Sequence, residues 1–209
     1  MSRIASAAPA IAAPLVLALS TAPAFAQEMR ARTNEVHVYV GQFFGDDLTD
    51  GPIDAAGTTP EVDDDITWGV RYGYNFTEMW GIDVSAGWTP TAATSLAGDD
   101  IDLDITTLDI SAIWHFTPDS PLVGYTIFGL GYAMADLDTP IPAVVDGLPA
   151  VIDDDDGFTA NAGIGAKWFA TEAMVIRGEA RYRYIDKLVD TLDDSLNSFE
   201  VTLGLGWRF

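Results

Sequence analysis

The last eleven residues of the chain, numbered 199–209, read FEVTLGLGWRF and decide how the rest of the sequence is interpreted. Every second residue is apolar, from Phe199 through Trp207 to Phe209, and the residues between them are polar or glycine. This period of two is typical of a β-strand with one apolar face. A soluble sheet would cover that face with a second layer, whereas lipid covers it in a barrel that spans a membrane.

The same alternation recurs along the chain and predicts eight strands. The expected strands are residues 35–45, 66–76, 80–88, 102–116, 122–135, 158–168, 174–185 and 199–209. We expect short turns at 77–79, 117–121 and 170–172, and long acidic loops at 46–65, 91–100, 136–157 and 186–195. Leu103 and Ile105 have the opposite parity to the apolar residues later in their strand, which predicts a β-bulge near Thr106 and Thr107.

These features predict an all-β fold, an eight-stranded antiparallel transmembrane barrel with an up-and-down meander. Short turns on the periplasmic side and long loops outside are typical of bacterial outer-membrane barrels. Trp80 and Trp114 lie near short turns and Trp68 and Trp88 near long loops, as two aromatic girdles at the membrane interfaces would require. A soluble barrel or sandwich, the alternative, would place these residues in a core.

Composition excludes some classes of partner. The chain has 209 residues, a formal net charge of −22 and no cysteine. Nucleic-acid phosphates require a basic surface, so we expect no nucleic-acid binding. Disulfides and thiolate metal sites cannot form without cysteine.

The N-terminus predicts export. Arg3, an apolar run at 11–19 and the Ala24-Phe25-Ala26 sequence are typical of a cleavable secretory signal at residues 1–26. We therefore expect a barrel domain of residues 27–209 in the outer membrane of a Gram-negative bacterium. In that part nine basic residues stand against 32 acidic ones, a net charge of −23.

Charged residues accumulate on the face of the strands that points into the barrel. The charged residues at these inward-facing positions are Glu35, Arg71, Asp83, Asp109, Lys167, Arg177, Glu179, Arg181, Arg183, Glu200 and Arg208. An eight-stranded barrel has room only for side chains, and buried charges need partners. We expect a packed network of ion pairs, with Arg183 beside Glu200 and Arg71 diagonal to Asp83. The alternative is a gate whose pairs exchange partners to admit ions or small solutes.

The acidic loops raise the question of calcium. Residues 100–104 have alternating acids, but Ile105 stands where a calcium loop requires glycine and Ser111 where it requires glutamate. The acidic run at 153–156 does not match a calcium loop either, because Ile152 stands at the first ligand position. We expect no metal site or cofactor, and an acidic, solvated surface. Loose binding of divalent cations stays an alternative.

An enzyme is the least favoured class. Nucleophilic catalysis needs a base within hydrogen-bond reach of the nucleophile, and the chain has only two histidines, His37 and His115. Ser111 shares a face with His115 but lies four residues away along an extended strand, too far for a direct hydrogen bond. The sequence therefore predicts no catalytic residues.

The chain resembles the small eight-stranded outer-membrane barrels typified by the OmpA transmembrane domain, OmpX and OmpW. The resemblance rests on the signal, the three short turns, the glycine–aromatic stretches at 129–132 and 204–209, and the terminal Phe209. It implies that the C-terminal strand is read by the barrel-assembly machinery, with Leu203, Leu205, Trp207 and Phe209 as the assembly signal. Because the sequence ends at the eighth strand, we expect no peptidoglycan-binding role.

The resulting expectation is a structural, surface-exposed envelope protein, a monomer in outer-membrane lipid whose loop partner the sequence does not identify. The first alternative, implied by the resemblance to OmpW, is a narrow channel or uptake route for small, apolar solutes. Tyr39, Phe43, Ile113, Tyr125 and Ile127 could line an apolar part of such a route. The third reading is a lipid-modifying barrel enzyme.

Overall fold

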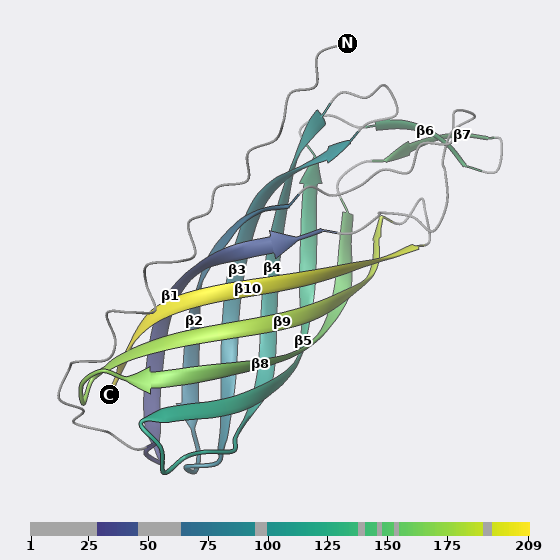
Figure 1. Cartoon of the computed structure of the whole chain (residues 1–209). Helices are drawn as coiled ribbons and strands as arrows, with labels where there is room; N and C mark the ends of the chain where they lie inside the picture. The colour runs from purple at the N-terminus through teal and green to yellow at the C-terminus, as the bar shows by residue number, and fades with distance from the viewer. Residues whose placement is uncertain are drawn as a thin grey trace, which may run out of the picture.

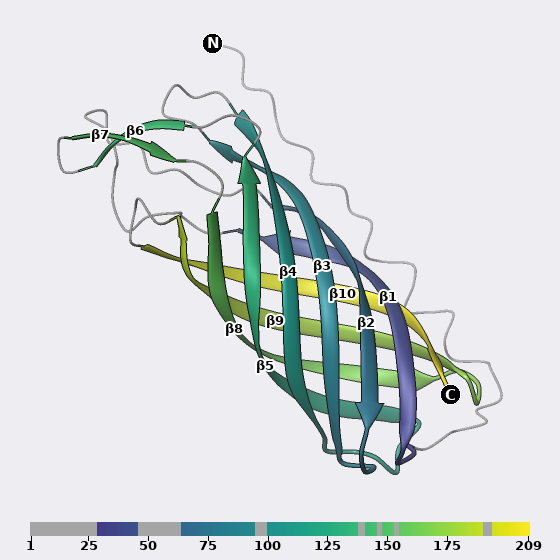
Figure 2. The ribbon, with the colours of Figure 1, turned by 180° about the vertical axis from the view of Figure 1, so that it is seen from behind.

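Eight long strands form a closed antiparallel barrel (Figure 1, Figure 2). The computed structural model describes residues 29–45, 64–94, 100–137, 141–145, 148–152, 155–189 and 194–209, so the signal predicted for 1–26 lies outside the described residues. The barrel strands are β1 (Thr33–Phe44), β2 (Asp65–Asn75), β3 (Trp80–Thr94), β4 (Asp100–His115), β5 (Leu122–Leu137), β8 (Asp155–Phe169), β9 (Met174–Val189) and β10 (Asp194–Arg208). The predicted fold class is confirmed.

The C-terminal strand closes the barrel. Pairing of β10 with β1 runs from Glu35 opposite Arg208 to Phe44 opposite Phe199. Every other strand pairs with its neighbours in the ring order β1-β10-β9-β8-β5-β4-β3-β2. The short turns and the C-terminus lie at one end of the barrel in Figure 1. None of the described residues forms a helix long and apolar enough to cross a membrane.

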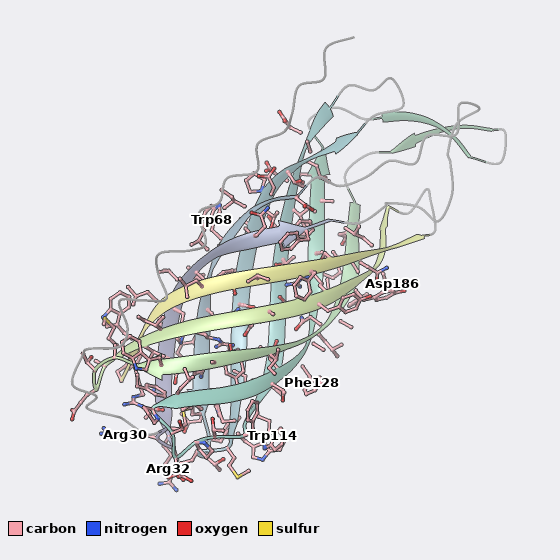
Figure 3. All side chains as sticks on the ribbon, in the orientation of Figure 1. Arg30, Arg32, Trp68, Trp114, Phe128 and Asp186 are labelled. Atoms are coloured by element: carbon pink, nitrogen blue, oxygen red, sulfur yellow. The ribbon has the colours of Figure 1, made fainter. Side chains whose placement is uncertain are left out.

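Residues that alternate along each strand face alternately the lumen and the outer wall of the barrel. Outward side chains stay exposed, for example Val38 at 51% and Phe128 at 61%, because lipid rather than protein covers them. Aromatic residues gather at two levels: Trp80 lies against Trp114 near the short turns, and Trp68 stacks on Trp88 toward the other end, with ring centroids 5.0 Å apart. Figure 3 shows Trp114 and Trp68 at these two levels, with Phe128 on the outer wall.

The β-bulge predicted at Thr106 and Thr107 is wrong. The registers of β4 with both β3 and β5 run through these residues without a shift. Leu103 and Ile105 point into the barrel instead, where both are almost fully buried. They can do so because this end of the lumen is apolar, so the assumption that apolar side chains always face lipid fails there.

Three of the predicted loops contain more strand than expected. In the loop predicted at 186–195, β9 continues to Val189 and β10 begins at Asp194. Strand β3 continues to Thr94 and β4 begins at Asp100, so strand residues occupy part of the loop predicted at 91–100. The loop predicted at 136–157 contains a hairpin of β6 (Ile141–Val145) and β7 (Leu148–Ile152), which forms a separate two-stranded sheet. The hairpin lies at the end of the barrel away from the short turns (Figure 1, Figure 2).

Candidate functional site

Strand β9 supplies half of a charged network inside the barrel. Four charged residues occupy every second position of β9, so the pleat of the strand directs their side chains to the same face. They are Arg177, Glu179, Arg181 and Arg183. That face is the lumen, and the side chains of Arg177 and Arg183 are only 1% and 2% exposed. One strand therefore places three cations and one anion along the axis of the barrel.

The upper part of the network, toward the loop end, links β9 to β4 and β10. Arg183 Nε lies 3.0 Å from Glu200 Oε1, and Arg183 Nη1 lies 2.7 Å from Asp109 Oδ1. Arg181 continues the chain, with Nη1 3.4 Å from Asp109 Oδ2 and Nη2 2.8 Å from Glu179 Oε1. These contacts join neighbouring and opposite walls of the barrel.

The lower part links β9 to β2 and β3. Arg177 Nη2 lies 2.7 Å from Glu179 Oε2, and Arg177 Nη1 lies 2.6 Å from Asp83 Oδ2. Arg71 Nη2 lies 3.1 Å from Glu179 Oε1, and Arg71 Nε lies 3.7 Å from Asp83. Together with the upper part, four arginines and four carboxylates form one continuous, electrically balanced chain.

Neutral side chains complete the hydrogen bonding of this network. Arg177 Nε donates to the Tyr125 hydroxyl at 2.6 Å, and that hydroxyl donates to Glu179 at 2.7 Å. The Arg177 guanidinium also lies over the Tyr125 ring, 4.6 Å from its centroid. Asp109 accepts hydrogen bonds from Asn161 and Thr159. Buried ion pairs are stable only with such additional hydrogen bonds, so these residues belong to the site.

A second, smaller charged group lies nearer the short turns. Lys167 Nζ lies 2.7 Å from Glu35 Oε2, His37 Nε2 lies 3.1 Å from the same oxygen, and Asn75 donates to Glu35 Oε1 at 3.0 Å. At the rim, Arg208 donates to the main-chain carbonyl of Glu172. The negative charge of Glu35 thus compensates the positive charge of Lys167, and this group carries no net charge when His37 is neutral.

Apolar clusters lie above and below the charged groups. Near the loop end the cluster consists of Phe43, Leu103, Ile105, Ala133, Ala135, Ile185 and Leu196. Near the short turns it consists of Met29, Val123, Phe169 and Val175. The charged layer is therefore enclosed between two apolar layers.

Residues 29–32, here called the strap, cross the short-turn mouth of the barrel. Strand β1 begins at Thr33, and β5 stands opposite β1 in the ring. The main-chain amide of Met29 nevertheless donates to the carbonyl of Pro118 in the β4–β5 turn at 3.0 Å. Arg32 has a positive φ of 60°, an uncommon conformation outside glycine, where the strap joins β1. The strap brings the Met29 side chain, 2% exposed, into the mouth.

All eleven charged residues named from the sequence are buried. The diagonal placement of Arg71 and Asp83 follows from a register that sets Arg71 opposite Ser85. Glu200 lies directly opposite Arg181 and reaches Arg183 diagonally. The residues of the expected assembly signal, Leu203, Leu205, Trp207 and Phe209, are exposed on the outer wall.

Sequence reasoning missed several residues of the site. The alternation of the strand predicts that Asn161 and Thr159 face the lumen, but it does not show that both donate hydrogen bonds to Asp109. Tyr125 was assigned to an apolar lining, although its hydroxyl joins Arg177 to Glu179. Met29 precedes the first strand and has no periodic pattern to mark it. His37 and Glu35 are two positions apart on the same face of β1, so their contact could have been predicted from the sequence.

The described residues offer little for metal or nucleophilic chemistry. Within them, no group of three His, Asp or Glu residues is placed to hold a metal ion. Neither ring nitrogen of His115 nor the hydroxyl of Ser111 has a hydrogen-bond partner in the described part of the chain. In the described part of the chain, Ser111 and His115 are therefore not hydrogen-bonded to each other.

A closed barrel with an apolar outer wall, two aromatic girdles and a charged interior defines a protein that crosses a bilayer as strands. The sequence matches the model of the outer membrane protein beta-barrel domain over residues 11–209, and the chain belongs to this family. The protein is therefore an outer-membrane barrel. No curated protein matches the sequence.

Solved structures with the same fold come from several bacteria. Neisserial surface protein A is 18% identical, with a TM-score of 0.59, covering 84% of this chain and 97% of its own. OprG from Pseudomonas aeruginosa is 14% identical, with a TM-score of 0.54 and coverages of 88% and 99%. Ail from Yersinia pestis, in complex with the heparin analogue sucrose octasulfate, is 17% identical, with a TM-score of 0.52 and coverages of 86% and 99%. At these identities the similarity shows the fold alone.

Proposed function

We propose that this protein is a closed outer-membrane scaffold, which holds acidic segments at the cell surface and does not conduct solutes through its lumen. The observation that carries the proposal is the continuous chain of four arginines and four carboxylates, enclosed between two apolar clusters. An ion entering the lumen would have to displace these contacts in a low-dielectric interior, which is costly.

The distribution of charge supports a role for the loop end. Inside the barrel five cations balance five carboxylates, leaving Arg208 at the rim aside. Other acidic side chains that the structure describes are exposed, so the negative charge that they add lies on the surface; they include Asp102, Asp104, Asp119, Asp136, Asp156, Glu172 and Asp186. Such a surface repels polyanions, and a ligand like the heparin analogue bound by Ail does not suit this protein.

An apolar uptake route has weaker support. Phe43 belongs to the apolar cluster near the loop end, whereas Ile113, Tyr125 and Ile127 form a different cluster. The Arg177 guanidinium lies over the Tyr125 ring. The Arg71 guanidinium lies over the Tyr39 ring, with its Cζ 4.9 Å from the ring centroid. The two tyrosines expected to line a route are thus in contact with arginines of the network.

Osmotic swelling of proteoliposomes tests the closed lumen. We expect vesicles containing the refolded protein to swell in isosmotic glycine or arabinose no faster than empty vesicles, while vesicles with a general porin swell quickly. Heat-shifted gel mobility confirms that the barrel is folded. Swelling above the empty-vesicle rate would contradict the proposal.

Accessibility of a small tag on intact cells tests the display of the loop end. A tag inserted between Asp146 and Gly147, where β6 and β7 meet in sequence, should react with an impermeant label on intact cells. The matched control is the same tag after Asp119 in the β4–β5 turn, which should react only after the outer membrane is permeabilised. The reverse pattern would contradict the proposed orientation.

A further inference from the structure

The strap carries two exposed cations at the short-turn end of the barrel. Among the Lys and Arg side chains that the structure describes, only those of Arg30 and Arg32 are exposed. The arginines of the charged network and Lys167 are paired with carboxylates, but within the described residues neither Arg30 nor Arg32 forms an ion pair. Figure 3 shows the two residues close together at this end of the barrel. Their charges are therefore available to a ligand outside the lumen.

Hydrogen bonds and one buried side chain hold the main chain of these arginines in place. Met29 is fixed by its buried side chain and by the hydrogen bond from its main-chain amide to the β4–β5 turn. The amide of Arg32 donates to the carbonyl of Asn75 at 2.7 Å, and the Thr33 hydroxyl donates to the carbonyl of Arg30 at 2.8 Å. Because the strap is already ordered, a ligand that binds both guanidinium groups loses less affinity to ordering the chain.

A third arginine adds to the positive charge at this mouth. Arg208 donates to the main-chain carbonyl of Glu172 at the rim. The like charges of Arg30 and Arg208 oppose each other, while the carboxylates of Glu35 and Glu172 act on Arg208 in the opposite sense. An anion bound at Arg30 would reduce the repulsion between the two arginines.

The carboxylates of the short turns leave the strap unneutralised. Glu78, Asp119 and Glu172 are exposed, one in each of the three short turns. Within the described part of the chain, none of them forms an ion pair with Arg30 or Arg32. The anion that fits this end must therefore be small enough to meet the arginines without approaching the turn carboxylates.

The neighbours of the strap place it near the lipid headgroups. Asn75, which accepts the hydrogen bond from Arg32, lies between Tyr74 and Phe76 in the sequence. The rings of Tyr74 and Phe76 are in edge contact, with centroids 5.1 Å apart, and Phe76 is 50% exposed. Aromatic residues of this kind mark the level of the headgroups in a bilayer. Phosphate is thus an anion within reach of the strap.

The chemistry of two neighbouring arginines favours phosphate over a carboxylate. A guanidinium binds either group through two parallel hydrogen bonds. One arginine already occupies both oxygens of a carboxylate, whereas a phosphate group offers further oxygens to a second arginine. A second copy of this chain would bring the same cations against each other, so it does not fit this site.

We propose that Arg30 and Arg32 of the strap form a phosphate-binding site at the short-turn mouth of the barrel. The phosphate group belongs either to a phospholipid headgroup at the aromatic girdle or to a soluble phosphate at the mouth. The inference concerns the end of the barrel opposite the acidic loops, and it does not rest on the closed lumen or on the role proposed for the loop end.

Lipid titration of the folded full chain in a nonionic detergent tests the site. The probes are three dioleoyl lipids: phosphatidylglycerol, zwitterionic phosphatidylcholine, and dioleoylglycerol hemisuccinate, whose anionic group is a carboxylate. Native mass spectrometry, which counts bound lipids, should show that the first phosphatidylglycerol binds about fivefold or more tightly than either of the others. Its affinity should fall as salt is raised, because salt screens exposed charges.

Competition with inorganic phosphate identifies the source of the phosphate group. We expect millimolar phosphate to leave phosphatidylglycerol bound, because the acyl chains add contacts with the girdle that a free ion lacks. Displacement of the lipid by inorganic phosphate, at the ionic strength of a chloride control, would assign the same site to a soluble phosphate.

Three variants assign the binding to the strap. Arg30→Gln combined with Arg32→Gln should weaken phosphatidylglycerol binding at least about tenfold, since each arginine near anionic lipid contributes. Met29→Ala keeps both cations but frees the main chain, and should weaken binding at least about twofold. The matched control is Lys187→Gln, which removes a cation from β9 near the loop end and should bind like the parent. Heat-shifted gel mobility verifies that each variant is folded.

Equal affinities for the three lipids would overturn the inference, because they would show that neither charge nor phosphate is recognised. Unchanged phosphatidylglycerol binding in the folded Arg30 and Arg32 double variant would do the same. Unchanged binding in the Met29 variant would show that the strap does not hold a built site. A channel that conducts would contradict the proposed function and leave this inference standing.

Discussion

Arg183 and Glu200 show how single residues stabilise the interior. Their side chains are 2% and 10% exposed, so the charge of Glu200 depends on Arg183 for compensation, and the charge of Arg183 depends on Glu200 and Asp109. Removing one member of a buried pair leaves the other uncompensated, whereas removing both relieves that cost. The energetic value of a pair therefore appears only when single and double variants are compared.

The first prediction concerns this pair. Arg183→Ala should lower the free energy of unfolding by about 3–5 kcal/mol, because it leaves Glu200 buried without its partner. The double variant with Glu200→Ala should lose less than the sum of the two single variants. Urea unfolding in lipid vesicles, followed by tryptophan fluorescence, measures all three. Val201→Ala, on the outer wall beside Glu200, is the control, and strict additivity of the pair would contradict the prediction.

The second prediction compares two glycines on opposite faces. A Cβ on Gly131 would meet the carbonyl of Leu108 and the carboxylate of Asp109, whereas a Cβ on Gly178 meets nothing within 4 Å. Gly131→Ala should therefore destabilise the barrel by at least about 1 kcal/mol, the lower end for overpacking. Gly178→Ala should stabilise it by about 0.5–1 kcal/mol, since alanine loses less entropy than glycine in a strand. The same unfolding assay checks both, and equal effects would refute the assignment of faces.

At the level of elements, the strap is the part whose release can be followed separately from the barrel. Met29 packs with Val123, Phe169 and Val175 in the mouth, while Arg30 and Arg32 are exposed beside it (Figure 3). Trypsin cuts after arginine only where the chain can leave its folded position. Cleavage at Arg30 and Arg32 thus reports on how firmly Met29 is held.

The third prediction is that Met29→Ala releases the strap. Truncating a buried methionine costs about 2–5 kcal/mol, which raises the open population more than about tenfold when only the strap opens. Mass spectrometry should show faster cutting at Arg30 and Arg32, with the heat-shifted gel mobility of the barrel unchanged. Met79→Ala, an exposed methionine at the same end, should behave like the parent. No change in the Met29 variant would show that the side chain does not hold the strap.

The sequence predicted the strands well because membrane strands must alternate. Val36, Val38 and Val40 face outward, and Glu35 and His37 face inward, as the period of two requires. The prediction failed at Leu103 and Ile105, since the rule that apolar residues face lipid does not hold where the lumen itself is apolar.

Long-range contacts were harder to predict than faces. Parity placed Arg177 and Asp83 in the lumen, but their contact across the barrel depends on the curvature of the closed sheet. The hairpin of β6 and β7 was missed because an all-apolar segment has no period of two. The strap was missed because its position depends on the Met29 side chain and on hydrogen bonds from the main-chain amides of Met29 and Arg32 to Pro118 and Asn75, none of which a sequence pattern marks.

The molecule as a whole combines a lumen of balanced charges with exposed acidic residues outside it. The charged network joins β2, β3, β4, β9 and β10, so it connects walls that are not neighbours in the sheet. Such links across the lumen support the proposal that the loop end, rather than the lumen, meets other molecules.

Single-channel conductance of the refolded protein in a planar bilayer shows whether the lumen is closed. We expect a silent bilayer for the parent, because the ion pairs and the two apolar clusters occupy the lumen. Variants with Arg183→Ala, Glu200→Ala or both should stay silent unless they also lose the heat-shifted mobility of the folded barrel. Steady openings of the folded parent, altered in size or duration by these substitutions, would contradict the account and identify a gated channel.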